Sequence, residues 1–278
     1  MKIVFDYRPK KELIKYFALL LHLHTKNYLN KHKLPTPPKI SKKTLQEFKR
    51  FLNEETGYYS PLAYLLFSKG LNKRESEKLN HILGKYEEID KNYSKLIKRV
   101  ESFKENLEQI KPEIKKLLNK AEKYTKVKFI PNQIVAIPIP YGAGGSSLSF
   151  KKNLYICFRA YKKSDIKKKY FVYLILHETL HLLNLLPPNS KISRRLDKKY
   201  KGHWLYGEFS NVINESFTRA IEYRIATKRK EINKKNSEFL KFGKTKLFFE
   251  QLRDDYEKNP KYKNIKQFGL EVIKNFLF

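Results

Sequence analysis

The stretch LILHETLHLL, residues 174–183, places His177 and His181 four residues apart inside an apolar run. The apolar flanks predict a buried helix, and residues four apart on a helix project from one face. Both imidazoles can therefore bind one metal ion, while Glu178 reaches a water molecule bound to that metal. Polar groups in a buried helix need partners, so a metal-free hydrogen-bonded cluster is the alternative interpretation.

A catalytic zinc site usually has three protein ligands and an open fourth position, so a further ligand is expected downstream. The extended metzincin motif is excluded, because Asn184 and Pro187 stand where that motif requires glycine and a third histidine. A second helix, predicted over residues 211–223 from its apolar spacing, offers Glu215 beside its buried stripe. Two imidazoles and one carboxylate suit Zn²⁺ best, so Zn²⁺ is the predicted cofactor.

Four further residues are candidates for supporting roles. Glu222 lies seven residues beyond Glu215, on nearly the same helix face. It is the alternative third ligand, a partner that orients a ligand histidine, or a salt-bridge partner of Arg219 or another basic residue. His203 and Tyr206 stand in a glycine-flanked loop, from which either could approach the metal or stabilise a transition-state oxyanion. Ordinary loop residues are the alternative interpretation for both. Asn214 directly precedes the predicted third ligand and is the fourth candidate.

The HExxH stretch followed by Asn214-Glu215 resembles the gluzincin group of zinc metallopeptidases, in which thermolysin-like enzymes pair HExxH with a downstream Asn-Glu. The resemblance is local, over roughly residues 150–225, and the gap before Glu215 is longer than in thermolysin-like enzymes. The layout is also similar to that of prokaryotic HExxH proteins of unknown substrate. The resemblance implies a peptidase acting on a peptide or protein substrate, with Glu178 as the catalytic residue that activates water.

The predicted fold class is α+β and mostly α-helical. The resemblance implies a zincin-like catalytic domain with a small mixed sheet and an active-site helix, which we assign to residues 126–230. Residues 1–125 are expected to form a helical N-terminal region. Residues 231–278 are expected to form a helical C-terminal region that packs on the body of the protein.

Helix-like blocks dominate the N-terminal region. Apolar residues recurring at three- and four-residue spacing predict amphipathic helices packed together. The blocks cover residues 11–29, 43–53 and 61–71 and a long charged series over 74–124.

Extended structure is expected in the middle of the chain. Prolines within residues 127–141 favour an edge strand or irregular extended structure. Residues 154–159 predict a strand, and the resemblance implies that this strand borders the cleft and pairs with an extended peptide. The glycine-rich residues 141–147 lack the Gly-Lys-Ser/Thr of a phosphate loop, so they predict a rim or a connector.

The chain is strongly basic, with 60 Lys and Arg against 28 Asp and Glu and a formal net charge of +32. Such a charge attracts nucleic acid or another polyanion, although lysines spread along the whole chain also fit a generic solvated surface. Two alternatives to a peptidase therefore stay open. One is a basic nucleic-acid-associated protein or DNA-linked protease, and the other is an inactive interaction module with a zincin fold.

The single cysteine, Cys157, excludes an internal disulfide. The N-terminal residues lack the apolar segment of a secretory signal, and the apolar residues 170–186 are too polar and too short for a membrane span. A cytoplasmic location is the expectation.

Overall fold

The computed structural model describes residues 1–24, 29–30, 35–57, 59–141, 145–160, 168–201, 208–227 and 243–277. Within these residues the protein is a mostly helical α+β structure with one four-stranded mixed sheet, which confirms the predicted class. The chain divides into two compact units. The first consists of Met1–Lys111 and Pro131–Phe171, and the second of Pro112–Ile130 and Val172–Phe278. The three predicted domain ranges stay a prediction.

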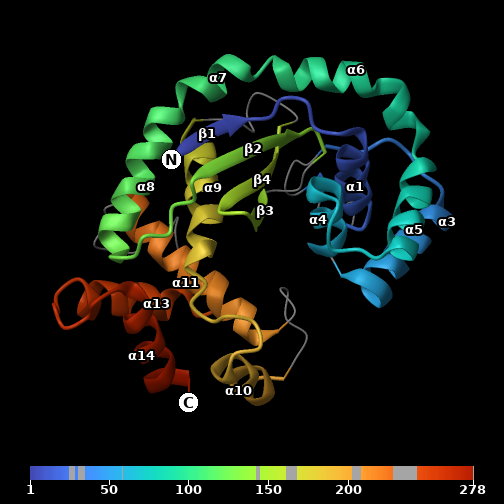
Figure 1. The fold of residues 1–278 in the computed structure, drawn as a ribbon. Helices are drawn as coiled ribbons and strands as arrows, with labels where there is room; N and C mark the ends of the chain where they lie inside the picture. Colours follow the sequence, from blue (N-terminus) through green and yellow to red (C-terminus); the bar gives the residue numbers. More distant parts are fainter. Residues whose placement is uncertain are drawn as a thin grey trace. The chain divides into compact units, whose positions relative to one another are not determined.

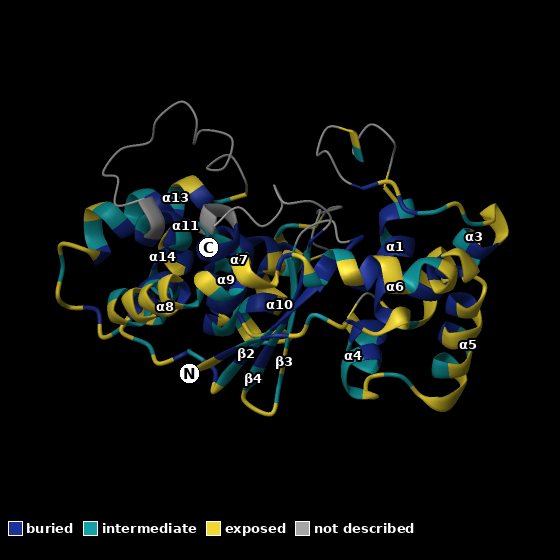
Figure 2. Ribbon diagram, turned by 90° about the horizontal axis from the view of Figure 1, so that it is seen from above, coloured by how far each residue is buried: buried dark blue, intermediate teal, exposed yellow. Residues whose placement is uncertain are grey.

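The sheet belongs to the first unit and has the strand order β1-β2-β4-β3 (Figure 1). Its strands are β1 (Lys2–Phe5), β2 (Gln133–Ile139), β3 (Gly145–Phe150) and β4 (Asn153–Arg159). β1, β2 and β4 run parallel to one another, and β3 is antiparallel to β4. β2 and β4 are mostly buried (Figure 2), as expected of central strands in a parallel sheet. β1 lies in the region predicted to be helical. The sequence did not indicate this strand, because four residues are too few to show a periodicity.

The prediction of an edge strand within residues 127–141 is wrong, because β2 lies between β1 and β4. The carbonyl of Ala136 accepts a hydrogen bond from the N–H of Asp6, at 3.0 Å, on the β1 side. Alternate residues of a parallel strand face opposite neighbours, so Pro138 faces the β1 side as well. β1 has already ended at Phe5, so the ladder has no hydrogen bond to lose where proline lacks an N–H.

Residues 154–159 form most of β4, which confirms the predicted strand. The expectation that this strand pairs with a peptide is wrong, because β4 is already paired with β2 on one side and β3 on the other. The edge strands of the sheet are β1 and β3. The glycine-rich residues 145–147 are the first residues of β3, so the prediction of a rim or a connector is wrong there. β3 contains three serines, and its sequence lacks the apolar alternation that identifies a strand.

The helices of the first unit follow the predicted blocks. They are α1 (Lys11–His22), α3 (Lys42–Arg50), the π-helical turn η1 (Phe51–Thr56), α4 (Tyr59–Phe67), α5 (Lys73–Gly84), α6 (Glu87–Glu101) and α7 (Lys104–Gln109). α1 packs against α4, α5 and α6 and carries much of the apolar core. Its buried Lys15 forms an ion pair with Asp90 of α6 at 2.6 Å, so the charge inside this helix layer is compensated.

The second unit contains the helices that carry the predicted site. They are α8 (Lys111–Thr125) and α9 (Lys168–Leu180), whose first residues belong to the first unit, then the 3₁₀ turn η3 (His181–Leu183), α10 (Lys191–Lys199), α11 (Phe209–Thr227), α13 (Thr245–Gln251), the π-helical turn η5 (Leu252–Tyr256) and α14 (Ile265–Leu277).

The C-terminal helices pack on α11 (Figure 1). The rings of Phe217 on α11 and Phe248 on α13 lie 5.2 Å apart in an edge-on arrangement. On α14, a Cβ atom at Gly269 would lie 2.9 Å from both Leu185 and Phe217, so glycine permits the close approach of this helix. None of the helices in the described part of the chain has the length and apolar character needed to cross a bilayer.

Candidate metal centre

His177 and His181 lie where α9 gives way to the η3 turn. The sequence predicts one helix through this stretch, whereas α9 ends at Leu180 and His181 begins the 3₁₀ turn. Asn184 then adopts the left-handed conformation, with φ 42° and ψ 66°, and the turn ends there. The two imidazole rings are almost perpendicular, at 89°, and their Nε2 atoms are 3.2 Å apart. The tighter turn therefore still directs both Nε2 atoms toward one point.

Glu215 of α11 completes a three-residue cluster with the two histidines. Its Oε1 lies 3.4 Å from Nε2 of His177, and its Oε2 lies 3.2 Å from Nε2 of His181. Zinc bonds to nitrogen and oxygen of about 2.0–2.1 Å give tetrahedral ligand-to-ligand distances of about 3.3 Å. The two Nε2 atoms, and Oε2 of Glu215 with Nε2 of His181, lie close to this value, each pair at 3.2 Å. The three residues could therefore hold a metal ion, and their donor atoms are ones that zinc accepts.

Glu222 contacts the other nitrogen of the first histidine. Its Oε2 lies 2.9 Å from Nδ1 of His177, while Glu215 lies on the Nε2 side of the same ring. A carboxylate that contacts the ring nitrogen away from the metal, here Nδ1, fixes the tautomer and the orientation of a metal-binding histidine. Glu222 therefore lies on the Nδ1 side of His177, and Glu215 lies on the Nε2 side, within the group of residues that could hold a metal ion.

The charges of the cluster compensate one another. Burial lowers the pKa of His177, but hydrogen bonds and charges from Glu215 and Glu222 outweigh burial and raise this pKa to about 10. Burial raises the pKa of Glu215, but hydrogen bonds from the two histidines and the charge of Arg219 lower it overall. Without a metal, the two carboxylates therefore favour the protonated form of His177, and a metal at Nε2 must displace that proton.

Asn214 ties the segment after η3 to α11. Its side-chain Oδ1 accepts a hydrogen bond from the N–H of Leu186, and its Nδ2 donates one to the carbonyl of Leu186, both at 2.9 Å. Leu186 is buried, so these two backbone groups have little access to water. The pair of bonds fixes the backbone that leaves the second histidine against the helix that carries Glu215.

Replacing Asn214 with aspartate is expected to destabilise the protein by about 1–3 kcal/mol, because the carboxylate cannot donate to the buried carbonyl of Leu186. Urea unfolding measures the change. The matched control is Asn211→Asp, the same substitution at an exposed position of the same helix, where a change within about 0.5 kcal/mol is expected. Equal effects at the two positions would contradict the role of the amide as a clamp.

Arg219 contacts Glu215, whereas the sequence suggested it only as a salt-bridge partner of Glu222. Its Nε donates to Oε1 of Glu215 at 2.6 Å, four residues along α11. The i,i+4 spacing of opposite charges is the sequence signal that could have identified the pair.

The remaining candidates are Glu178, His203 and Tyr206. Glu178 follows His177 on α9 and is only 7% exposed. His203 and Tyr206, the two loop candidates, lie outside the described residues.

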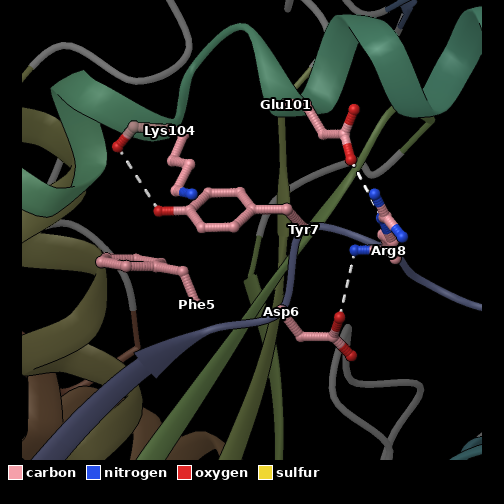
Figure 3. A pocket seen from close by; sticks show the side chains of 6 residues that line it. All are labelled: Phe5, Asp6, Tyr7, Arg8, Glu101 and Lys104. Carbon is pink, nitrogen blue, oxygen red and sulfur yellow. Dashed lines mark hydrogen bonds and ion pairs between the residues drawn. The ribbon is translucent and has the colours of Figure 1, made fainter.

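A separate cavity of about 360 Å³ lies in the first unit, at the carboxyl end of β1 (Figure 3). It is lined by Phe5, Asp6, Tyr7, Arg8, Glu101 and Lys104. Arg8 and Glu101 form an ion pair at 3.0 Å, and Tyr7 donates a hydrogen bond to the carbonyl of Lys104 at 3.4 Å. No member of the His177 cluster lines this cavity, so the metal-binding chemistry belongs to a different set of residues.

No protein-family model, curated protein or solved structure matches this chain. The chemistry is therefore inferred from the cluster itself. Among the described residues, His177, His181 and Glu215 form a group of ligand atoms that lie within 4.8 Å of one another and could hold a metal ion.

Proposed function

We propose that the protein is a zinc-dependent metallopeptidase of the gluzincin type, with a zincin-like catalytic domain and a peptide or protein substrate. The observation that carries the proposal is the convergence of two imidazoles and one carboxylate, whose ligand atoms lie within 4.8 Å of one another. Three protein ligands are the number that catalytic zinc sites use, which leaves one position for water or substrate. A structural site would more often have four protein ligands.

When bound, zinc makes water nucleophilic at neutral pH and polarises the scissile carbonyl. Glu178 takes the proton from the attacking water and delivers it to the leaving amine. Glu222 accepts the hydrogen bond from Nδ1 of His177, so that Nε2 presents its lone pair to the metal. Asn214 holds the backbone behind the second histidine in place.

The test is the zinc content of the purified protein together with its action on an unfolded protein substrate. One zinc per chain, with cleavage that a chelator stops and added zinc restores, would support the proposal. Zinc without cleavage of any peptide would remove the peptidase assignment but keep the metal site. A protein that takes up no zinc, even when zinc is supplied, would overturn both.

A second candidate function is the binding of a polyanion through α10. Its exposed basic residues recur at i, i+3, i+4 and i+7, which places them on one face of the helix: Lys191, Arg194, Arg195 and Lys198. Asp197, the acidic residue of this helix, accepts hydrogen bonds from the N–H and hydroxyl of Ser210 at 2.7 and 3.0 Å. The outward face of α10 is therefore of one sign, which favours the phosphates of a nucleic acid.

Neutralising this face is expected to weaken DNA binding and to reduce its salt dependence, because each lost phosphate contact lowers the log–log slope by about 0.9. Fluorescence anisotropy over a series of salt concentrations measures both. The test variant replaces three basic residues of α10 with glutamine: Lys191, Arg194 and Lys198. The control variant removes the same charge from α6 by replacing three exposed lysines of similar spacing with glutamine: Lys91, Lys95 and Lys98. Equal losses would indicate that the net charge acts without a specific surface.

A further inference from the structure

Arg219 and Glu215 form a short ion pair at the centre of the candidate site. The Nε–Oε1 distance is 2.6 Å, and the side chain of Glu215 is 8% exposed. A charge-assisted hydrogen bond of this length is strong, and its strength grows where water is largely excluded. The arginine is therefore a fixed part of the site.

The two oxygens of Glu215 have different surroundings. Oε1 accepts the hydrogen bond from Arg219 and lies 3.4 Å from Nε2 of His177. Oε2 lies 3.2 Å from Nε2 of His181. A carboxylate can bind a metal through one oxygen or through both, and a guanidinium that holds one oxygen leaves the other as the better ligand atom.

We infer that Arg219 is a positioning residue that restricts Glu215 to one metal-binding oxygen, Oε2. This inference rests on the proposed zinc site. A carboxylate that bound through both oxygens would occupy an additional coordination position. Limiting Glu215 to one oxygen keeps the coordination number low and leaves a position for water or substrate, which catalytic chemistry requires.

The helix makes this arrangement possible. Arg219 follows Glu215 by four residues on α11, so the two side chains lie one above the other on the same face. The arginine also supplies a positive charge and a hydrogen-bond donor to Glu215. Lysine could supply the same charge and one donor, whereas a hydrophobic residue of similar length would supply neither.

The experiment replaces zinc with cobalt(II), whose visible absorption is strong in four-coordinate sites and weak in sites of higher coordination number. Arg219→Met removes the donor and keeps the length of the side chain. We expect this variant to bind cobalt and to lose the strong visible absorption of the wild type. Arg219→Lys restores a donor and should keep that absorption.

The matched control is Arg224→Met, which breaks the ion pair between Arg224 of α11 and Glu257, the residue that follows η5. Its cobalt spectrum should equal that of the wild type. This control shows whether a spectral change in Arg219→Met comes from Arg219 itself or from the loss of any ion pair of α11. An unchanged spectrum in Arg219→Met would overturn the inference, as would a wild-type protein that binds no cobalt. A cobalt site that responds as expected in a protein without peptidase activity would support the inference and reject only the peptidase assignment.

Discussion

Replacing Glu178 with glutamine is expected to lower kcat/KM for peptide hydrolysis by about 10²–10⁴-fold and to leave zinc binding unchanged. Glu178 directly follows His177 on α9 and is 7% exposed, so it lies in the same turn as the proposed ligand His177. Glutamine has the same shape as glutamate, but its amide cannot take a proton from water. The substitution therefore removes the general base without removing a ligand.

Steady-state hydrolysis of one defined peptide, with zinc per chain measured on the same samples, checks this expectation. Glu222→Gln is the matched control, because it makes the same chemical change in a carboxylate that contacts Nδ1 of His177. That control should weaken zinc binding by about 10–100-fold and should recover activity when zinc is raised. A Glu178→Gln protein that keeps the wild-type rate would show that another group activates the water.

The parts of the site that depend on helix periodicity could be predicted from the sequence. His177 and His181 are four residues apart, and the apolar spacing of residues 211–223 indicated the helix that brings Glu215 to them. The path of the chain between these two segments did not have to be predicted. A catalytic zinc site requires a third ligand, and the second helix offered one.

Other features depend on contacts that one sequence does not reveal. The position of β2 at the centre of the sheet depends on β1, whose four residues come from the opposite end of the first unit's sequence. Proline suggested an edge, since its missing N–H is harmful inside a ladder, but Pro138 falls beyond the end of β1. The strand order also reversed the expected role of β4, because a paired strand has no edge for a peptide.

The supporting residues show the same difference. Asn214 was a candidate because of its position before Glu215, yet its two hydrogen bonds to Leu186 depend on the path of the chain after Asn184. Glu222 was left as either a ligand or an orienting partner, because spacing alone cannot distinguish the two nitrogens of an imidazole. The distances make that distinction, with Glu222 at Nδ1 and Glu215 at Nε2 of the same ring.

Loss of a metal ligand should have the other large effect. His181→Ala and Glu215→Gln are each expected to reduce zinc from about one per chain to near zero, because a catalytic site with only two protein ligands retains zinc poorly. Glutamine at position 215 keeps the size of the side chain beside Arg219, so loss of metal is not confused with loss of packing. Elemental analysis after gel filtration measures the zinc.

Thermal unfolding provides a second measurement of the same property. In the wild type, free zinc at 100 times its dissociation constant should stabilise the folded protein by about 2.7 kcal/mol, because a ligand that binds only the native state shifts the unfolding equilibrium. His181→Ala and Glu215→Gln should lose this stabilisation, whereas Glu222→Ala should keep it at a higher zinc concentration. If Glu222→Ala lost zinc completely and Glu215→Gln retained it, Glu222 would be the third ligand. The ion pair with Arg219 would then be the structural role of Glu215.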